Sequence, residues 1–332
     1  MPVARACGTL SAVRGAERRA IGWRALAVLA AALAVPAALA AWYAARPAPA
    51  VAHLSARPAV HSVHRLRRAQ LPSVLHLVDR SRRIRLPGGR RVPRPVTTYL
   101  WYPPRGNGPW PLVVFGHGYA STPFVYRRLL RAWARAGYLV AAPLFPLGNA
   151  HAPGGPDEDD IVNQPRDMSF VISQLLAASS SATSPLHALV DPSRIAVAGQ
   201  SDGAMTAFAT AYERPWRDRR VRAAIVLSGA ELGHRIRLDP HAAPLLAVQG
   251  TADHVNEPVY SRQLFRAVDR PKFLLLIEHA GHLPPYTVPG ARLALVERVS
   301  IAFLDRYLGS GSFGAIPRAA APFPAARLTS DP

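Results

Sequence analysis

The chain has 332 residues, which is enough for one large domain with appended segments, and a net charge of +20. Such a charge favours nucleic-acid or membrane partners in general, but most of the surplus lies in residues 1–94, with 17 arginines against two acidic residues. Residues 95–332 carry 23 basic and 18 acidic residues and lack basic patches with interleaved aromatic residues. We therefore expect no nucleic-acid partner. The single cysteine, Cys7, excludes an intrachain disulfide.

The N-terminal region has the pattern of a membrane anchor or an export signal. A basic leader, residues 1–24, precedes 21 uncharged and mostly apolar residues, 25–45. As a helix, such a segment spans about 30 Å, the thickness of the hydrocarbon core of a bilayer. The basic flank predicts a single-pass anchor with its N-terminus inside and the rest of the chain outside the cytoplasm. A cleaved signal is the alternative, because Ala38-Leu39-Ala40 and Ala48-Pro49-Ala50 resemble cleavage sites.

Residues 72–308 alternate between apolar runs of strand length and amphipathic stretches of helix length. The runs at 74–78 and 96–102 predict an antiparallel pair. Six more strands are predicted at 112–115, 139–142, 195–198, 223–227, 245–249 and 273–277. Helices are predicted at 124–136, 160–178, 203–213, 258–269 and 291–308. This pattern indicates an α/β fold with a mostly parallel, eight-stranded sheet and helices on both faces.

Three segments lie outside the predicted strands and helices. Residues 46–71 are rich in Pro, Ala and Arg, which predicts an extended linker. Residues 309–332 are rich in Gly, Ser, Ala and Pro, and we expect a loosely ordered, low-complexity tail. The segment 229–244 is too short for an inserted helical domain, so we expect an open cleft without a large lid.

A Gly-x-Ser-x-Gly motif, Gly199 to Gly203, follows a predicted strand and opens a predicted helix. That context is typical of a nucleophile elbow, in which the tight turn requires glycines and projects the serine, Ser201, above the sheet. Ser201 is therefore the candidate nucleophile. We expect Gln200, the residue before it, to line the substrate site.

A nucleophilic serine needs a base and a carboxylate that orients the base. Asp253 follows the strand at 245–249, and His282 follows the strand at 273–277, so both belong to loops at the carboxyl ends of strands. The order Ser, Asp, His is that of an α/β-hydrolase. His279 is the rival base. Glu231 and Glu257 are the rival acids, although a carboxylate at Glu257 also suits the start of a helix.

The tetrahedral oxyanion of acyl transfer needs two backbone donors. We expect the amide of Asp202, directly after the nucleophile, to be one of them. The second is expected from the loop after the strand at 112–115, with the amide of Tyr119 as donor. His117, Gly118 and the Tyr119 ring are expected to contact substrate. A carboxylate at Asp202 opposes a developing oxyanion unless its side chain points away.

Together, His117-Gly118-Tyr119, the elbow, Gly250-Thr251-Ala252-Asp253 and Gly281-His282 resemble the α/β-hydrolase superfamily. The Gly-Tyr loop and the lead-in at 191–195 are similar to dienelactone-hydrolase-like, chlorophyllase-like and polyester-hydrolase-like esterases. The resemblance implies serine-dependent ester hydrolysis through an acyl-enzyme, without a cofactor, on a small-molecule or polymeric ester. Ser201 stands where dienelactone hydrolases use cysteine, and Asp202 stands where polyester hydrolases usually have an apolar residue.

Two other functions remain open from the sequence. The same triad serves an amidase or a thioesterase, and Asp202 beside an anchor segment also suits a catalytically silent binding protein. The acidic run at 157–160 lacks the alternating spacing of calcium ligands, so we expect no metal there. We interpret it as a solvated loop that caps the helix beginning near Ile161.

Overall fold

One nine-stranded sheet runs through the part of the chain that the structure describes. The structure is a computed structural model, and it describes residues 72–233, 236–239 and 243–332. The sheet belongs to one compact unit, Pro58–Pro332.

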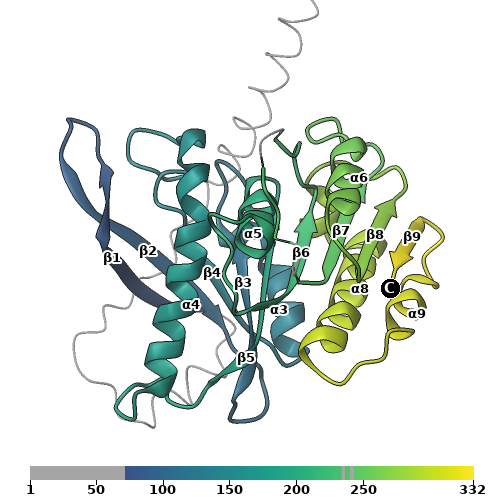
Figure 1. Ribbon diagram of the computed structural model, residues 1–332, viewed down its shortest axis with the longest axis horizontal. Helices are drawn as coiled ribbons and strands as arrows, with labels where there is room; N and C mark the ends of the chain where they lie inside the picture. Colours follow the sequence, from purple (N-terminus) through teal and green to yellow (C-terminus); the bar gives the residue numbers. More distant parts are fainter. Residues whose placement is uncertain (1–71, 234–235, 240–242) are drawn as a thin grey trace, which may run out of the picture. The chain divides into compact units, whose positions relative to one another are not determined.

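The strands are β1 (Ser73–Arg85), β2 (Arg91–Trp101), β3 (Trp110–Gly116), β4 (Leu139–Pro143), β5 (Val190–Gln200), β6 (Val221–Leu227), β7 (Leu245–Gly250), β8 (Lys272–Ile277) and β9 (Ala326–Asp331). They lie in the order β1-β2-β4-β3-β5-β6-β7-β8-β9 (Figure 1). Pairing is parallel from β4 to β8 and antiparallel at the two edges. The carboxyl ends of six neighbouring strands, β4, β3, β5, β6, β7 and β8, therefore meet at one edge of the sheet, where ligands bind in such folds.

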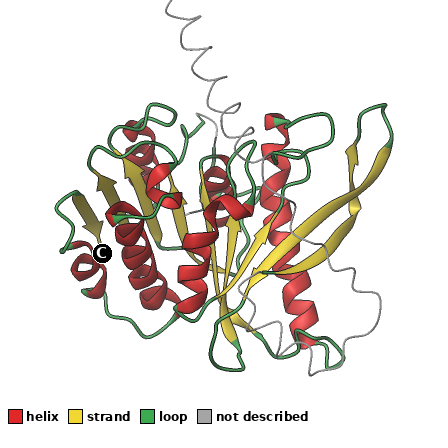
Figure 2. Cartoon of the chain, turned by 180° about the vertical axis from the view of Figure 1, so that it is seen from behind, coloured by secondary structure: helices red, strands yellow, loops and turns green. Residues whose placement is uncertain are grey.

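The helices are η1 (Pro123–Tyr126), α3 (Arg127–Arg135), η2 (Glu158–Asn163), α4 (Gln164–Ser180), α5 (Asp202–Tyr212), α6 (Pro258–Ala267), α7 (Pro284–Thr287), α8 (Ala291–Leu308) and α9 (Ala315–Ala320). They cover both faces of the sheet (Figure 2). Strand side chains alternate between two buried clusters, so Val113 and Phe115 pack with α3 and α8, whereas Leu112 and Val114 pack with α4 and α5. The unit Pro58–Pro332 thus has two hydrophobic cores of its own.

Every strand and helix predicted between residues 72 and 308 is present. The antiparallel opening pair is confirmed, but β1 extends to Arg85 where the sequence predicted an end at Val78. The prediction of a loosely ordered tail at 309–332 is wrong. Residues 315–320 form α9, and β9 pairs with β8 along six residues, so the sheet has nine strands where eight were predicted.

Other predictions concern segments that the structure covers only in part or not at all. The basic leader, the apolar segment 25–45 and the linker 46–71 lie outside the described residues. Among the helices that are described, none is long and apolar enough to cross a bilayer. Residues 229–233, 236–239 and 243–244, which are the described part of the segment before β7, contain no helix.

Candidate active site

Ser201 lies at the sharp turn between β5 and α5, in the middle of the sheet (Figure 1). Its backbone has φ 56° and ψ −120°, a left-handed conformation that costs a residue other than glycine about 1–3 kcal/mol. A Cβ atom at Gly199 would lie 1.9 Å from Gly203 O, and one at Gly203 would lie 2.1 Å from Gly116 O. Only glycine fits at either position. The local geometry is therefore that of a nucleophile elbow.

Asp253 and His282 meet across the ends of β7 and β8, with Asp253 Oδ2 and His282 Nδ1 2.8 Å apart. The carboxyl group is only 2 % exposed, and it also accepts hydrogen bonds from the Val255 and Asn256 amides and from Gln249 Nε2. Burial alone would raise the pKa of Asp253, but the hydrogen bonds from His282 and these groups outweigh it and lower the pKa. Asp253 is therefore a carboxylate that holds His282 in the tautomer with a lone pair on Nε2.

The rival residues do not enter this arrangement. His279 is exposed, and its backbone amide donates to Thr251. Glu257 is the N-cap residue of α6, as its position in the sequence suggested, and Glu231 is exposed in the segment after β6. Among the described residues, only Asp253 pairs with a histidine.

Gln200 differs from its predicted role as a substrate-lining residue. It is 1 % exposed, and its Nε2 lies 3.1 Å from both His282 Nε2 and His282 O. Its Oε1 accepts a hydrogen bond of 2.7 Å from the Tyr126 hydroxyl, which fixes the orientation of the amide. The described hydrogen bonds include none between His282 Nε2 and Ser201 Oγ. In this structure the Gln200 amide occupies the lone pair of the predicted base.

The loop after β3 lies directly beside the elbow. A Cβ atom at Gly118 would lie 3.3 Å from Ser201 Cβ, so this loop approaches the serine as predicted. The Gly118 amide donates to the Tyr126 hydroxyl at 3.3 Å, and the Ala120 amide donates to a carbonyl of a neighbouring loop. The Tyr119 amide lies between them with no acceptor among the described residues. The Asp202 amide belongs to the first turn of α5, where amides have no acceptor within the helix.

His117 is also not a substrate contact. It is 1 % exposed, and both ring nitrogens are used: the Phe145 amide donates to Nε2 at 3.1 Å, and Nδ1 lies 2.8 Å from Gly118 O. Burial lowers the pKa of His117 to about 4, so the ring is neutral and Nδ1 donates to the carbonyl. His117 therefore fixes the backbone of the Gly118 loop and does not bind substrate directly.

The side chain of Asp202 lies among other acidic groups. Burial and the nearby Glu158 carboxylate raise the pKa of Asp202 to about 6, although His282 lowers it. Burial also raises the pKa of Tyr119, and the nearby carboxylates of Glu158, Asp157 and Asp202 raise it further. The Tyr119 side chain is 41 % exposed, and its hydroxyl donates to a backbone carbonyl of the loop before η2 at 3.0 Å. The rim of the site on this side is acidic.

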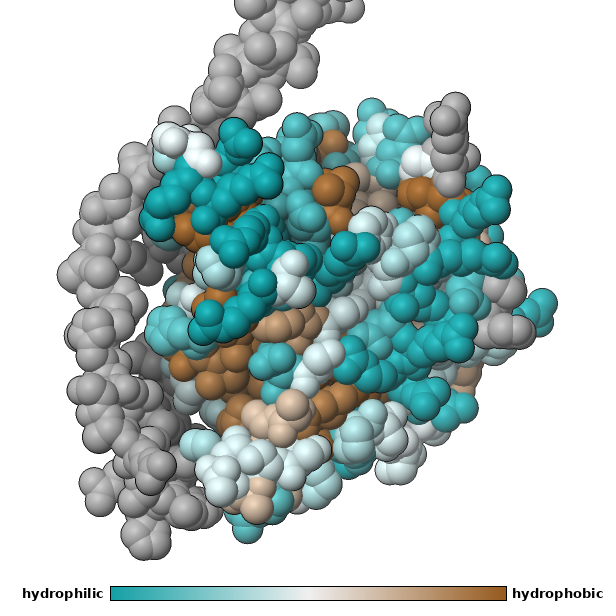
Figure 3. Space-filling view, turned by 60° about the vertical axis from the view of Figure 1, so that its left-hand side comes forward, coloured by the Kyte–Doolittle hydropathy of each residue, from teal (hydrophilic) through white to brown (hydrophobic). Residues whose placement is uncertain are grey.

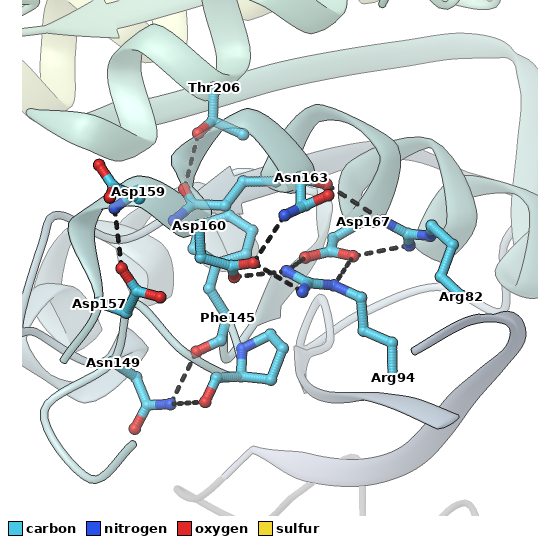
Figure 4. Close-up of polar contacts among 12 residues, drawn as sticks. Arg82, Arg94, Phe145, Asn149, Asp157, Asp159, Asp160, Asn163, Asp167 and Thr206 are labelled. Carbon is cyan, nitrogen blue, oxygen red and sulfur yellow. Dashed lines mark hydrogen bonds and ion pairs between the residues drawn. The ribbon is translucent and has the colours of Figure 1, made fainter. Parts of the chain in front are cut away.

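The acidic run also supplies a buried ion-pair cluster (Figure 4). Arg94 on β2 donates to Asp160 of η2 and to Asp167 of α4 at distances of 2.6–2.8 Å. Arg82 on β1 donates to Asp79 and Asp167. Asp160 is thus buried and paired, contrary to the predicted solvated loop. The expected capping is present, since the Asp157 side chain accepts from the Asp159 amide at the start of η2.

No group of three or more His, Cys, Asp or Glu side chains is placed to hold a metal ion within the residues that the structure describes. Tyr126, Gln249 and Asn256 support the site, but no sequence pattern predicted this role for them. The fold places each of them against the site residues, and none belongs to a motif that identified the site.

The family model of chlorophyllase matches residues 80–233, which include the Gly118 loop and the Ser201 elbow but not Asp253 or His282. Among solved structures, ferulic acid esterase from Streptomyces cinnamoneus is 21 % identical, with a TM-score of 0.59 over 78 % of this chain and 96 % of that one. No curated protein sequence matches. The chain has an α/β-hydrolase fold. With its elbow, it is a hydrolase of the carboxylesterase type that resembles chlorophyllase-like members.

Proposed function

We propose that the protein hydrolyses carboxylic esters through an acyl-enzyme formed on Ser201. The observation that carries this proposal is the 2.8 Å hydrogen bond between His282 Nδ1 and Asp253 Oδ2 beside a strained serine elbow. The family match and the fold support ester hydrolysis as the reaction class.

In the proposed reaction, Ser201 Oγ attacks the ester carbonyl carbon while its proton passes to His282 Nε2. The amides of Tyr119 and Asp202 stabilise the oxyanion, and the loss of one such donor typically costs about 3 kcal/mol. His282 then protonates the leaving alcohol. Water, deprotonated by His282, attacks the acyl carbon and releases the acid and free Ser201. Asp253 stays ionised and orients the imidazole throughout.

The resting contact of the Gln200 amide with His282 Nε2 implies one further step. Ser201 must replace Gln200 as the donor to Nε2 before it can lose its proton. The same contact favours the second candidate function, a binding protein whose base is blocked by Gln200.

The test is hydrolysis of p-nitrophenyl esters of increasing acyl length by the wild-type protein and by Ser201→Ala. A fluorophosphonate probe with peptide mapping would show which serine is acylated. Ser228→Ala is the matched control, because Ser228 is also a serine with positive φ at a strand end. We expect labelling and activity to disappear only in Ser201→Ala. Activity that survives in Ser201→Ala would refute the triad, and inert wild-type protein would favour the binding function.

We also propose that the protein is exported, with residues 25–45 as an anchor or signal. The support is the basic leader before an uncharged segment of 21 residues. N-terminal sequencing of the mature protein from fractionated cells tests it. Cytoplasmic protein that begins at Met1 would refute export.

A further inference from the structure

The antiparallel hairpin of β1 and β2 has one covered face and one uncovered face. Asp79, Ile84 and Arg94 point to the covered face, which packs against η2 and α4. The other face carries Val74, His76, Val78, Arg83 and Arg85 of β1 and their cross-strand partners on β2. At its base, Tyr99 packs on Phe124, and beyond that point the hairpin extends from the body of the unit (Figures 1 and 2).

The tip of the hairpin carries an unbalanced positive charge. Residues 80–94 include seven arginines and no acidic residue. The three carboxylates that reach the hairpin, Asp79, Asp160 and Asp167, bind Arg82 and Arg94. Five arginines remain exposed, and no described residue forms an ion pair with them: Arg80, Arg83, Arg85, Arg90 and Arg91. Residues 1–71, which lie outside the described residues, contain a single acidic residue in their sequence, Glu17.

Two of these arginines, Arg85 and Arg91, are direct cross-strand partners. Like charges in such positions destabilise a hairpin. An anionic partner that lies over both guanidinium groups would remove the repulsion, so the arrangement suits a bound state better than the free protein.

Exposed apolar side chains continue the same face. Val74 is 38 % exposed and Val78 is 43 % exposed, and the strand register places both on the same face as Arg83 and Arg85. Figure 3 turns the side of the molecule with the hairpin forward and shows hydrophobic and hydrophilic patches lying next to one another. Apolar side chains beside arginines on one face are typical of elements that lie in the interface of an anionic bilayer.

We propose that the uncovered face of the β1–β2 hairpin binds anionic phospholipid. Its arginines would contact lipid phosphates, and Val74 and Val78 would enter the headgroup region. The predicted membrane segment supports this occupant, because only 27 residues separate Ala45 from Ser73. Nucleic acid is disfavoured, since the only Phe, Tyr or Trp side chain on this face, Tyr99, is already packed on Phe124 and leaves no such ring free for a base to stack on.

The test is vesicle flotation of residues 58–332, the compact unit, which lacks the apolar segment 25–45. Vesicles of phosphatidylcholine with one third phosphatidylglycerol are compared with pure phosphatidylcholine. Each arginine near an anionic surface strengthens binding by about five-fold. We therefore expect the Arg83→Gln, Arg85→Gln, Arg91→Gln triple variant to bind at least 50-fold more weakly. Its melting temperature is expected to stay unchanged or rise, because the cross-strand repulsion is removed.

The matched control removes three exposed arginines elsewhere, Arg222, Arg262 and Arg266, and should leave binding within two-fold of wild type. Val74→Ser with Val78→Ser should weaken binding while the salt dependence stays the same. Equal losses in both triple variants would mean unspecific charge attraction and would overturn the proposal. Unchanged flotation of the hairpin variant, or tighter binding to a single-stranded oligonucleotide than to the vesicles, would overturn it as well. Ester hydrolysis in solution should be unaffected in all these variants.

Discussion

Replacing Tyr126 with phenylalanine removes a single hydroxyl group that joins two halves of the site. This hydroxyl donates to Gln200 Oε1 at 2.7 Å and accepts from the Gly118 amide at 3.3 Å. Burial raises the pKa of Tyr126 to about 12, so the hydroxyl remains a donor at every working pH. Through it, the loop that carries the Tyr119 amide is connected to the glutamine that contacts His282.

The expected cost follows from the groups left without partners. In Tyr126→Phe, Gln200 Oε1 and the Gly118 amide stay buried, and each unpaired group costs about 1–3 kcal/mol. We expect the free energy of unfolding to fall by about 2–4 kcal/mol. If roughly half of that loss also falls on the transition state, kcat/KM drops by about five-fold to thirty-fold, since 1.36 kcal/mol corresponds to a factor of ten. The change should appear in kcat and not in KM, because neither partner contacts substrate in the ground state.

The measurements are urea unfolding and steady-state hydrolysis of the best p-nitrophenyl ester. Tyr212→Phe is the matched control, because Tyr212 is equally buried and its hydroxyl donates to Pro244 O at 3.2 Å, remote from the elbow. The control should lose stability and keep kcat per folded molecule. A Tyr126→Phe protein with wild-type kcat, or a Tyr212→Phe protein with the same loss of kcat, would refute the reasoning.

Three further predictions concern buried charge. Asp202→Asn should keep kcat/KM within about ten-fold of wild type at pH 8, where Asp202, with a pKa of about 6, is ionised; a loss of several orders of magnitude would reveal a catalytic carboxylate. Burial raises the pKa of Glu213 from 4.5 to about 7, so the native state holds its proton more tightly and stability is lost as the pH rises through this range. Unfolding at pH 8 should therefore show Glu213→Gln about 1–3 kcal/mol more stable than wild type, with no gain at pH 4. Arg94→Met should lose about 3–5 kcal/mol in chemical denaturation, because it leaves Asp160 buried without an ion-pair partner and Asp167 paired with Arg82 alone, whereas Arg194→Met removes a half-exposed pair and should lose less than about 1 kcal/mol.

The sequence predicted those parts of the fold that follow local patterns. Buried parallel strands such as β5 and β6 are continuous apolar runs, so their positions were clear. The second half of β1 reads Asp-Arg-Ser-Arg-Arg-Ile-Arg, which has no strand pattern. It is extended because it pairs with β2 and because Arg82 forms an ion pair with Asp167, far along the chain. β9 likewise forms only because β8 offers a free edge.

The same division holds within the candidate site. Gly199 and Gly203 were predicted because the clash that a side chain would cause there is inherent in the turn itself. His117 and Gln200 lie inside the motifs that identified the site, and motif position alone suggested contact with substrate. The structure gives them other partners: His117 bonds to backbone atoms of two loops, and Gln200 bonds to Tyr126 and His282. A sequence motif fixes which residues are close to the reacting serine, but not which way their side chains point.

Gln200 shows why that orientation matters for the chemistry. Its amide can donate to His282 Nε2 only while that nitrogen is unprotonated, and it becomes a repulsive neighbour once His282 takes the proton of Ser201. The second hydrogen bond of the amide, to His282 O, involves the backbone and survives this change. The imidazole can therefore turn from Gln200 to Ser201 while its loop stays anchored. The glutamine before the nucleophile thus holds the base in place and must also release it, which makes its contact with His282 part of the activation barrier.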